Sequence, residues 1–336
     1  MKNSKKTRKR IVKNSLITIF ALVLLAPLGL FVIWFVPSLK VKVFKYIFET
    51  EERSILRNGI DRNGLEVTKN IPYVDDGNGF HLLDVYKRKG ASDKAPVIFH
   101  IHGGGLFASK KETNEPYCYE WARLGYNVVS ISYRLIPDTT LWNQINDCMT
   151  ALRYVHSHSA ELGLDLSECY ILGDSAGALL SYFTASINSS KELQEIFCIK
   201  GAPLEFDGMG LISIMLETQR DDLMSFITNM VTDENDVGKP YYKYLKDPSA
   251  LLEKASLPPA FFVTGDEDMI QSETYKLYKL FTERWIPCGI KNYPKGKAHS
   301  LEHVFAVKYP DIPESIEVRK LISDFWKSHQ DDRSRL

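Results

Sequence analysis

The sequence predicts an α/β protein with a mostly parallel central sheet, helices on both faces of the sheet and an inserted helical cap. Short apolar runs typical of strands buried in a parallel sheet recur along the chain, at residues 96–102, 127–133, 170–172, 208–215, 259–264 and 288–293. Helical patterns separate or follow these runs, at residues 117–124, 142–162, 178–183, 272–284 and 316–329. The alternation of the two patterns is typical of parallel strands joined by helical crossovers.

Two segments depart from this alternation. Residues 67–74 and 80–86 flank a turn rich in Asp, Asn and Gly, and we expect them to pair as a hairpin at the start of the domain. Residues 217–257 contain an apolar helical stretch at 223–231 and then an acidic loop. We interpret this segment as a cap inserted over the functional site.

Composition and charge exclude several classes of function. The 336 residues include 42 basic and 42 acidic ones, so the formal net charge is zero. A general nucleic-acid-binding protein needs a basic excess, and we expect no nucleic-acid partner. The five cysteines form no C-x-x-C pair, which argues against a disulfide framework or a zinc cluster. We expect neither a metal nor an organic cofactor.

The N-terminus combines a basic tail, residues 1–15, with a long apolar segment. Seven residues of the tail are basic and none is acidic, whereas the 21 residues from 16 to 36 carry no charge. A helix of that length spans about 30 Å, enough to cross a bilayer. A cleaved signal peptide has a shorter apolar region and a small-residue cleavage site, and residues 16–36 match neither feature. We therefore expect a retained transmembrane helix.

The charges on either side of this segment predict its orientation. Seven basic residues precede it and three lysines (Lys40, Lys42 and Lys45) follow it closely, so the positive-inside rule places the N-terminus in the cytoplasm. The large domain, residues 67–330, then lies on the extracytoplasmic side. Residues 37–66 have helical spacing and are expected to lie on the bilayer, to pack over the domain or to act as a plain spacer.

A candidate nucleophile follows the apolar run at 170–172. The sequence Gly173-Asp174-Ser175-Ala176-Gly177 has the form G-x-S-x-G, with a strand before it and a helix after it. A serine hydroxyl is a weak nucleophile, and a sharp turn between strand and helix exposes it to a base. The two glycines leave room for such a turn. A glycine-rich turn with a surface serine is the alternative interpretation.

A second motif makes that alternative improbable. The run 96–102 ends in His102 and continues as Gly103-Gly104-Gly105, so three glycines follow the C-terminal end of a buried strand. Together the two motifs resemble the hormone-sensitive-lipase-like esterases of the α/β-hydrolase superfamily. The resemblance extends to Leu83-Asp84-Val85-Tyr86 and Tyr133-Arg134-Leu135-Ile136-Pro137 and covers roughly residues 67–328.

The resemblance implies an α/β-hydrolase fold and hydrolysis of carboxylic esters through an acyl-enzyme. It implies that the N–H groups of Gly104, Gly105 and Ala176 form the oxyanion hole. His102, Gly103 and Asp174 would support these motifs, with His102 as an organiser of the glycine loop. The chain departs from the family pattern at Leu106, where an aromatic residue is common, and at Ala178, where a second glycine is common.

The acid and the base of a triad follow the nucleophile in this fold. Three carboxylates crowd the loop after residue 264, and the family pattern favours Asp268, with Asp266 as the alternative. For the base we favour His299, which follows Gly296 and Ala298 in the loop after the last strand. His303 lies four residues further on.

These residues predict a serine hydrolase acting on short- to medium-chain esters, with a small-molecule or lipid-like ester as substrate. A deacetylase or amidase that acts on acylated sugars, aryl amides or peptides would use the same triad and is the alternative. A binding protein on the same scaffold usually lacks part of this machinery, and here all parts are present.

Overall fold

The computed structural model describes residues 39, 41–43, 45–46, 62–92, 94–221, 225–227, 230–295 and 300–333. The chain divides into two units, residues 1–47 and 48–336. In the first unit the described residues are helical. The predicted anchor at 16–36 and most of the predicted linker lie outside the described residues. Within the described ranges, no helix is long and apolar enough to cross a membrane.

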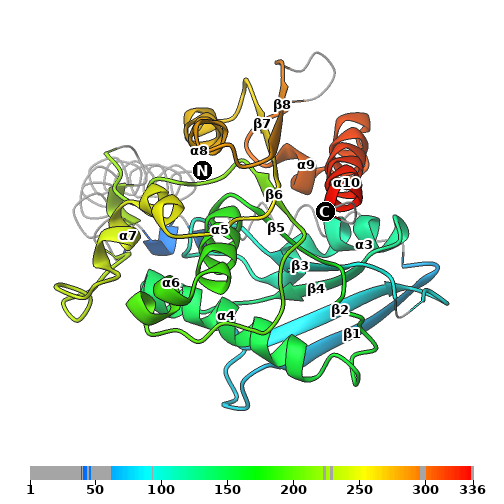
Figure 1. Cartoon of the computed structure of the whole chain (residues 1–336), viewed down its shortest axis with the longest axis horizontal. Helices are drawn as coiled ribbons and strands as arrows, with labels where there is room; N and C mark the ends of the chain where they lie inside the picture. The colour runs from blue at the N-terminus through cyan, green and yellow to red at the C-terminus, as the bar shows by residue number, and fades with distance from the viewer. Residues whose placement is uncertain are drawn as a thin grey trace, which may run out of the picture. The chain divides into compact units, whose positions relative to one another are not determined.

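The second unit is built on one eight-stranded sheet, drawn in Figure 1. Its strands are β1 (Leu65–Pro72), β2 (Leu82–Arg88), β3 (Val97–Ile101), β4 (Asn127–Ile131), β5 (Cys169–Asp174), β6 (Gly208–Ile212), β7 (Ala260–Gly265) and β8 (Cys288–Tyr293). They lie in the order β1-β2-β4-β3-β5-β6-β7-β8. The predicted hairpin is confirmed as the antiparallel pair β1–β2, and every pair from β4 to β8 is parallel.

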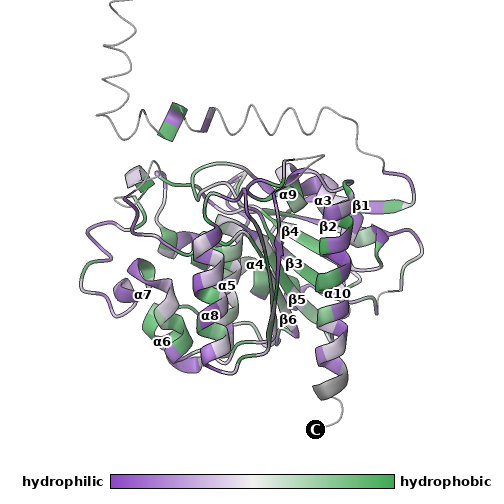
Figure 2. Cartoon of the chain, turned by 90° about the horizontal axis from the view of Figure 1, so that it is seen from above, coloured by the Kyte–Doolittle hydropathy of each residue, from purple (hydrophilic) through white to green (hydrophobic). Residues whose placement is uncertain are grey.

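Helices cover both faces of the sheet, as predicted. The α-helices are α3 (Glu115–Arg123), α4 (Leu141–Ser157), α5 (Ala176–Ser189), α6 (Lys191–Phe197), α7 (Tyr242–Lys246), α8 (Gln271–Glu283), α9 (Phe305–Lys308) and α10 (Pro313–Arg333). Figures 1 and 2 place α3 and α10 on one face and α4, α5 and α8 on the other. Three 3₁₀ segments complete the unit: η1 (Lys111–Asn114), η2 (Ser225–Ile227) and η3 (Pro248–Glu253).

The segment predicted as a cap contains only short helices in its described part. Between β6 and β7 these are η2, α7 and η3. A helix was predicted over 223–231, but the described residues there form only the three-residue turn Ser225–Ile227, and four others lie outside the description. Short helices have too few turns to show a clear 3.6-residue period, so the sequence pattern could not locate them.

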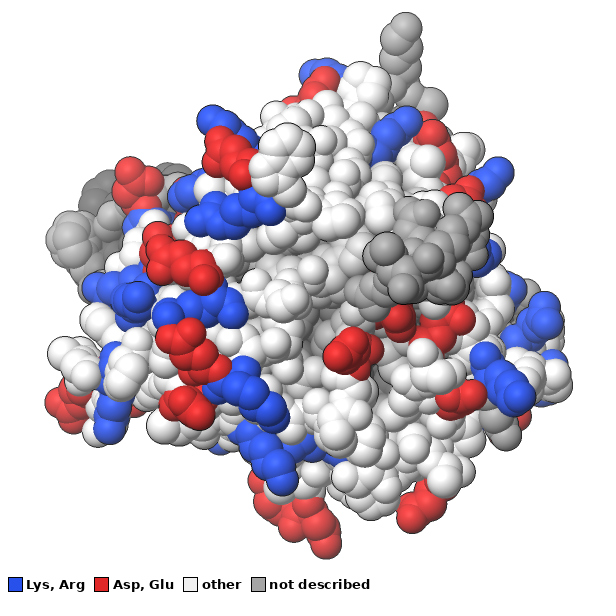
Figure 3. All heavy atoms as spheres, viewed as in Figure 1, with Lys and Arg blue, Asp and Glu red and all other residues white. Residues whose placement is uncertain are grey.

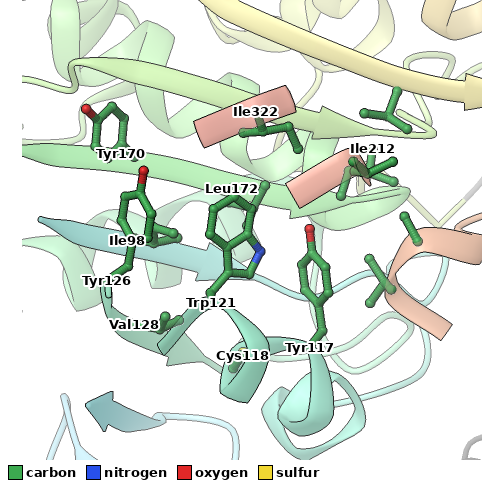
Figure 4. Packing of buried hydrophobic residues seen from close by; sticks show 14 of the residues in the cluster. Ile98, Tyr117, Cys118, Trp121, Tyr126, Val128, Tyr170, Leu172, Ile212 and Ile322 are labelled. Carbon is green, nitrogen blue, oxygen red and sulfur yellow. The ribbon is translucent and has the colours of Figure 1, made fainter. Parts of the chain in front are cut away.

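Aromatic side chains fill the core between the sheet and helices α3 and α10, and Figure 4 shows part of this cluster. Trp326 stacks on Tyr170 with ring centroids 4.2 Å apart and on Trp121 at 5.5 Å. A Cβ at Gly208 would lie 2.4 Å from the Trp326 ring, so this glycine in β6 lets the indole lie flat on the sheet. Rings of this size bury large apolar areas, and the cluster thereby fixes α10 against the strands.

The surface charge is mixed. On the face shown in Figure 3, acidic and basic side chains are interspersed, and no large area carries a single sign. This distribution agrees with the zero net charge of the chain. The face shown in Figure 3 has no basic stripe of the kind that binds nucleic acids.

Candidate active site

Ser175 occupies the turn between β5 and α5 in a strained backbone conformation. Its φ of 51° and ψ of −120° lie outside the regions that residues with a side chain favour. A Cβ at Gly177 would lie 2.2 Å from the carbonyl oxygen of Ile101, and a Cβ at Gly173 would lie 2.4 Å from the oxygen of Gly177. Both positions therefore require glycine, and this close packing of backbone holds the turn in its strained form.

A histidine and a carboxylate complete a hydrogen-bonded chain with this serine. His303 Nε2 lies 2.9 Å from Ser175 Oγ, and His303 Nδ1 lies 2.7 Å from Asp268 Oδ1. Asp268 comes from the loop after β7 and His303 from the loop between β8 and α9. This is the geometry of a nucleophile, a base and an orienting acid.

The structure corrects the choice of base. The favoured residue was His299, but His303 holds the position between Ser175 and Asp268. His299 itself lies outside the described residues. Both histidines follow the last strand, and their spacing contains no signal that distinguishes them. The path of the loop from β8 to α9 decides which imidazole reaches the serine.

The carboxylate of Asp268 is held by more than the histidine. Its Oδ1 also accepts the N–H of Ile270 at 3.1 Å, and its Oδ2 accepts the hydroxyl of Thr264 at 3.0 Å. Burial raises the pKa of Asp268, but the hydrogen bond and charge of His303, together with hydrogen bonds from Ser213 and the N–H of Ile270, outweigh that effect, so the pKa lies below its usual value. The alternative, Asp266, instead accepts hydrogen bonds from Asn292 and Gln271.

The glycine loop after β3 faces the same site. Gly104 and Gly105 have φ of 115° and 61°, a region that glycine enters at little cost. A Cβ at Gly104 would lie 2.3 Å from the carbonyl oxygen of Ala108, because the loop folds tightly back on itself. Ala176 is the first residue of α5, and N–H groups at a helix N-terminus have no carbonyl partner within the helix. Gly103 and Gly104 line the same pocket as Ser175, so the backbone of the glycine loop lies next to the nucleophile.

His102 and Tyr133 support the start of the glycine loop through hydrogen bonds and ring stacking. His102 is fully buried and donates from Nδ1 to the carbonyl oxygen of Gly103 at 2.7 Å. Its ring stacks on Tyr133 with centroids 4.4 Å apart, and the Tyr133 hydroxyl donates to the His102 carbonyl at 2.8 Å. Burial lowers the pKa of His102 to about 4, so the ring is neutral at neutral pH.

A buried carboxylate links the loop to the nucleophile turn. Oδ1 of Asp174 accepts the N–H of Gly103 at 3.1 Å and the side-chain amide of Asn114 at 2.6 Å. Burial raises the pKa of Asp174 to about 6, although these two hydrogen bonds lower it. The sequence contains no signal for Asn114, because its partner is 60 residues away in the chain.

These groups line a pocket of about 220 Å³. Gly103, Gly104, Ser175 and His303 line it, and its apolar lining residues are Met269, Val304 and Val307. Its polar lining residues outside the triad and the glycine loop are Ser109, Thr113, Asn114, Asp174, Glu267, Glu302 and Lys308. Helix α9 carries Val307 and Lys308. Figure 2 shows α9 at the top of the domain, at the opposite end from the C-terminus of α10.

Comparisons with known proteins give the family of this fold. A family profile described as alpha/beta hydrolase fold matches residues 98–303. The chain belongs to the α/β hydrolase family. The predicted resemblance is thus confirmed, and a serine in contact with a histidine–carboxylate pair makes this α/β hydrolase a serine hydrolase.

Several solved esterases share the fold. Esterase B from Lactobacillus rhamnosis superposes with a TM-score of 0.82 at 24% identity, over 89% of this chain and 96% of that chain. A bacterial heroin esterase has a TM-score of 0.67 at 19% identity, over 84% and 90% of the two chains. An esterase from the archaeon Pyrobaculum calidifontis has a TM-score of 0.63 at 22% identity, over 87% and 94%.

The site offers no metal-binding cluster in the described residues. Within those ranges, no three histidine, cysteine, aspartate or glutamate side chains converge as metal ligands. The described part of the site consists instead of a nucleophile, a base, an acid and backbone donors. These groups are sufficient for acyl transfer.

Proposed function

We propose that this α/β hydrolase cleaves carboxylic esters through an acyl-enzyme on Ser175. The observation that carries the proposal is the hydrogen-bonded chain from Ser175 through His303 to Asp268, with distances of 2.9 and 2.7 Å. Its position beside a glycine loop gives both parts that acyl transfer needs, an activated nucleophile and donors for an oxyanion.

The geometry supports the following mechanism. His303 takes the proton of the Ser175 hydroxyl as the oxygen attacks the ester carbonyl. Asp268 holds the imidazole in the tautomer with hydrogen on Nδ1 and stabilises the imidazolium that forms. The N–H groups of the glycine loop and of Ala176 receive the oxyanion. His303 then protonates the leaving alcohol, and water, activated by the same histidine, releases the acid.

The size of the pocket supports short- to medium-chain acyl groups. A cavity of about 220 Å³ with an apolar wall of Met269, Val304 and Val307 suits an uncharged, small substrate. Esterase B from Lactobacillus rhamnosis, 25% identical over 89% of this chain, is described with a C4-C4 tributyrin phosphonate. That protein's inhibitor has short acyl chains, which favours the same class of substrate here.

A deacetylase or amidase activity is the second candidate. The pocket is also lined by the hydroxyl-bearing residues Ser109 and Thr113, which fit the hydroxyl groups of an acylated sugar better than an alkyl chain. The triad attacks either carbonyl, so the leaving group and its contacts distinguish the two activities.

Hydrolysis of a p-nitrophenyl ester series from acetate to palmitate tests the proposal. The full chain is purified in detergent and compared with Ser175→Ala, and acetylated xylan and aryl acetamides are tested in parallel. We expect serine-dependent activity that is greatest between acetate and hexanoate. Activity on acetylated xylan or amides that exceeds activity on every simple ester would favour the second candidate. Ester turnover that is equal in Ser175→Ala would contradict both.

We also propose that residues 16–36 anchor the protein in a membrane, with the N-terminus in the cytoplasm and residues 67–330 outside it. The support is the uncharged run and the basic excess before it. Extraction of membranes at alkaline pH and protease treatment of intact cells test this topology. Release of the protein by alkaline washing, or protection of the large domain from external protease, would contradict it.

A further inference from the structure

The glycine loop that begins at Gly103 is followed by a segment that the mechanism above does not use. Residues 111–114, here called the crossing segment, follow the loop and precede α3. Four residues between 104 and 109 have positive φ: Gly104, Gly105, Leu106 and Ser109, with φ of 115°, 61°, 72° and 73°. Two of the four carry side chains, and each costs about 1 kcal/mol in this conformation. A loop strained in this way keeps its shape only if both of its ends are fixed.

The beginning of the crossing segment is fixed by a buried ion pair. Lys111 is 1% exposed, and its Nζ lies 2.9 Å from Oδ1 of Asp84, whose side chain is fully buried. The ammonium also donates to Asn70 Oδ1 at 2.8 Å and to the carboxylate of Glu112. The ammonium thus has two hydrogen-bond acceptors in addition to its ion-pair partner Asp84.

An irregularity in the pairing of β1 with β2 places acceptors around the Lys111 ammonium. The pairing of β1 with β2 shifts register between Thr68 and Ile71, and Asn70 in that interval has a φ of 58°. This bulge lets Asn70 accept from Lys111 with its side chain while its own N–H donates to Asp84 Oδ1 at 2.7 Å. Asp84 belongs to Leu83-Asp84-Val85-Tyr86, a motif that the triad and the oxyanion hole leave unexplained.

The end of the crossing segment reaches the nucleophile turn. Asn114 donates to Asp174 Oδ1 at 2.6 Å, and its amide lies 3.4 Å from His100 Nε2. At the beginning of the segment, the backbone N–H of Lys111 also donates to Ser132 Oγ at 3.0 Å, just after β4. The segment thus contacts residues of β1, β2, β3 and β5 and the end of β4, which are five neighbouring strands of the sheet.

We propose that Lys111 and Asp84 are positioning residues, which act through the crossing segment to set the distance between the oxyanion donors and Ser175. A buried ion pair adds little net stability compared with an apolar pair of similar size, because desolvation offsets the attraction. Its value here is geometric: the pair fixes one end of the segment on β2, and Asn114 fixes the other end on β5. The proposal rests on the ester hydrolysis proposed above.

Substitution of Lys111 by methionine tests this role. Lys111→Met keeps most of the length of the unbranched side chain and removes its charge. We expect kcat per active site to fall about 10- to 100-fold, since an error of about 1 Å in positioning has effects of this size. KM should change by less than about threefold, because substrate binding in the ground state does not depend on the oxyanion donors. Active sites are counted by titration with a fluorophosphonate.

A control variant and a double variant separate positioning from stability. Arg319→Met removes a buried cation of α10, which is 5% exposed and donates to the Pro310 carbonyl. It should lower the melting temperature while leaving kcat within about twofold. If Lys111→Met does not fold, Asp84→Leu/Lys111→Met removes both charges and should regain stability. Its kcat should remain reduced by about tenfold or more, because the ion pair that fixes the crossing segment on β2 is still absent.

The outcomes are distinct. A Lys111→Met or double variant with kcat within about twofold of the wild type would show that the pair is only structural, and would overturn the proposal. The rate of phosphonylation by the fluorophosphonate depends on the same donors and requires no ester substrate. A wild type that hydrolyses no ester contradicts the proposed function, whereas equal phosphonylation rates in the wild type and Lys111→Met contradict the positioning role.

Discussion

Replacement of His303 by alanine is the sharpest test of the site. His303 is the described side chain that bonds both Ser175 Oγ, at 2.9 Å, and Asp268 Oδ1, at 2.7 Å. Without it the serine has no base and the leaving alcohol has no acid, while the pocket and the glycine loop remain. Loss of one triad member typically lowers turnover by about 10⁴-fold or more, equivalent to about 5 kcal/mol of transition-state stabilisation.

The assay compares kcat/KM for p-nitrophenyl butyrate between the wild type, His303→Ala and His299→Ala. We expect the His299 variant to stay within about threefold of the wild type, since His303 holds the position of the base. Added imidazole should restore part of the activity of His303→Ala by occupying the vacated space. If His303→Ala keeps more than about a tenth of the activity and His299→Ala loses it, the base is His299 and the reasoning from this geometry is refuted.

Three further predictions test the packing and the electrostatics. Gly177→Ala places a Cβ 2.2 Å from the carbonyl oxygen of Ile101, so it should cost more than about 3 kcal/mol and lower Tm by roughly 10 °C, whereas Gly79→Ala should leave Tm unchanged. Burial raises the pKa of Asp174 from 3.8 to about 6, so the folded chain binds a proton there that the unfolded chain does not. The stability of the wild type relative to Asp174→Asn should therefore fall by about 2 kcal/mol as pH rises from about 4 to 6, and a constant difference in urea unfolding would contradict this. Trp285 has a φ of 57° and is 92% exposed, so Trp285→Gly should raise Tm by about 2 °C through relief of strain, and a fall in Tm would show that the indole makes a stabilising contact.

The nucleophile could be predicted because its constraints are local. The turn at Ser175 requires glycines two residues before and after it, where a Cβ would collide with backbone oxygens. Such a requirement appears directly in the order of residues. The candidate acid, Asp268, was predicted from the family pattern, with Asp266 as the alternative, and it lies within hydrogen-bond distance of His303.

The base could not be assigned by the same reasoning. His299 and His303 both follow β8, and the imidazole that reaches Ser175 depends on how the loop crosses the sheet toward α9. Val304, directly after His303, has a φ of 54° and donates its N–H to Ser213 Oγ at 3.3 Å, a contact across 91 residues. No periodicity or spacing in the loop indicates that contact.

Elements with a strong sequence pattern were predicted, whereas short helices were missed. Strands β3 to β8 lie at the six predicted apolar runs, and β1 and β2 lie at the predicted hairpin. Strands β3 to β7 are buried along their whole length, and a strand buried on both faces must be apolar throughout. The short helices α6, α7 and α9 were missed because one or two turns show no clear period.

Local order along the chain was therefore enough for the fold class, the strands, the nucleophile and the glycine loop, since each depends on the sterics or the burial of neighbouring residues. The contacts that make these parts work together join distant residues: His303 with Ser175, Asn114 with Asp174 and Lys111 with Asp84. They depend on how the strands are ordered in the sheet and how the loops pass over their ends. Packing of the whole chain sets that arrangement, and so only the folded structure could show which histidine, amide and ammonium belong to the site.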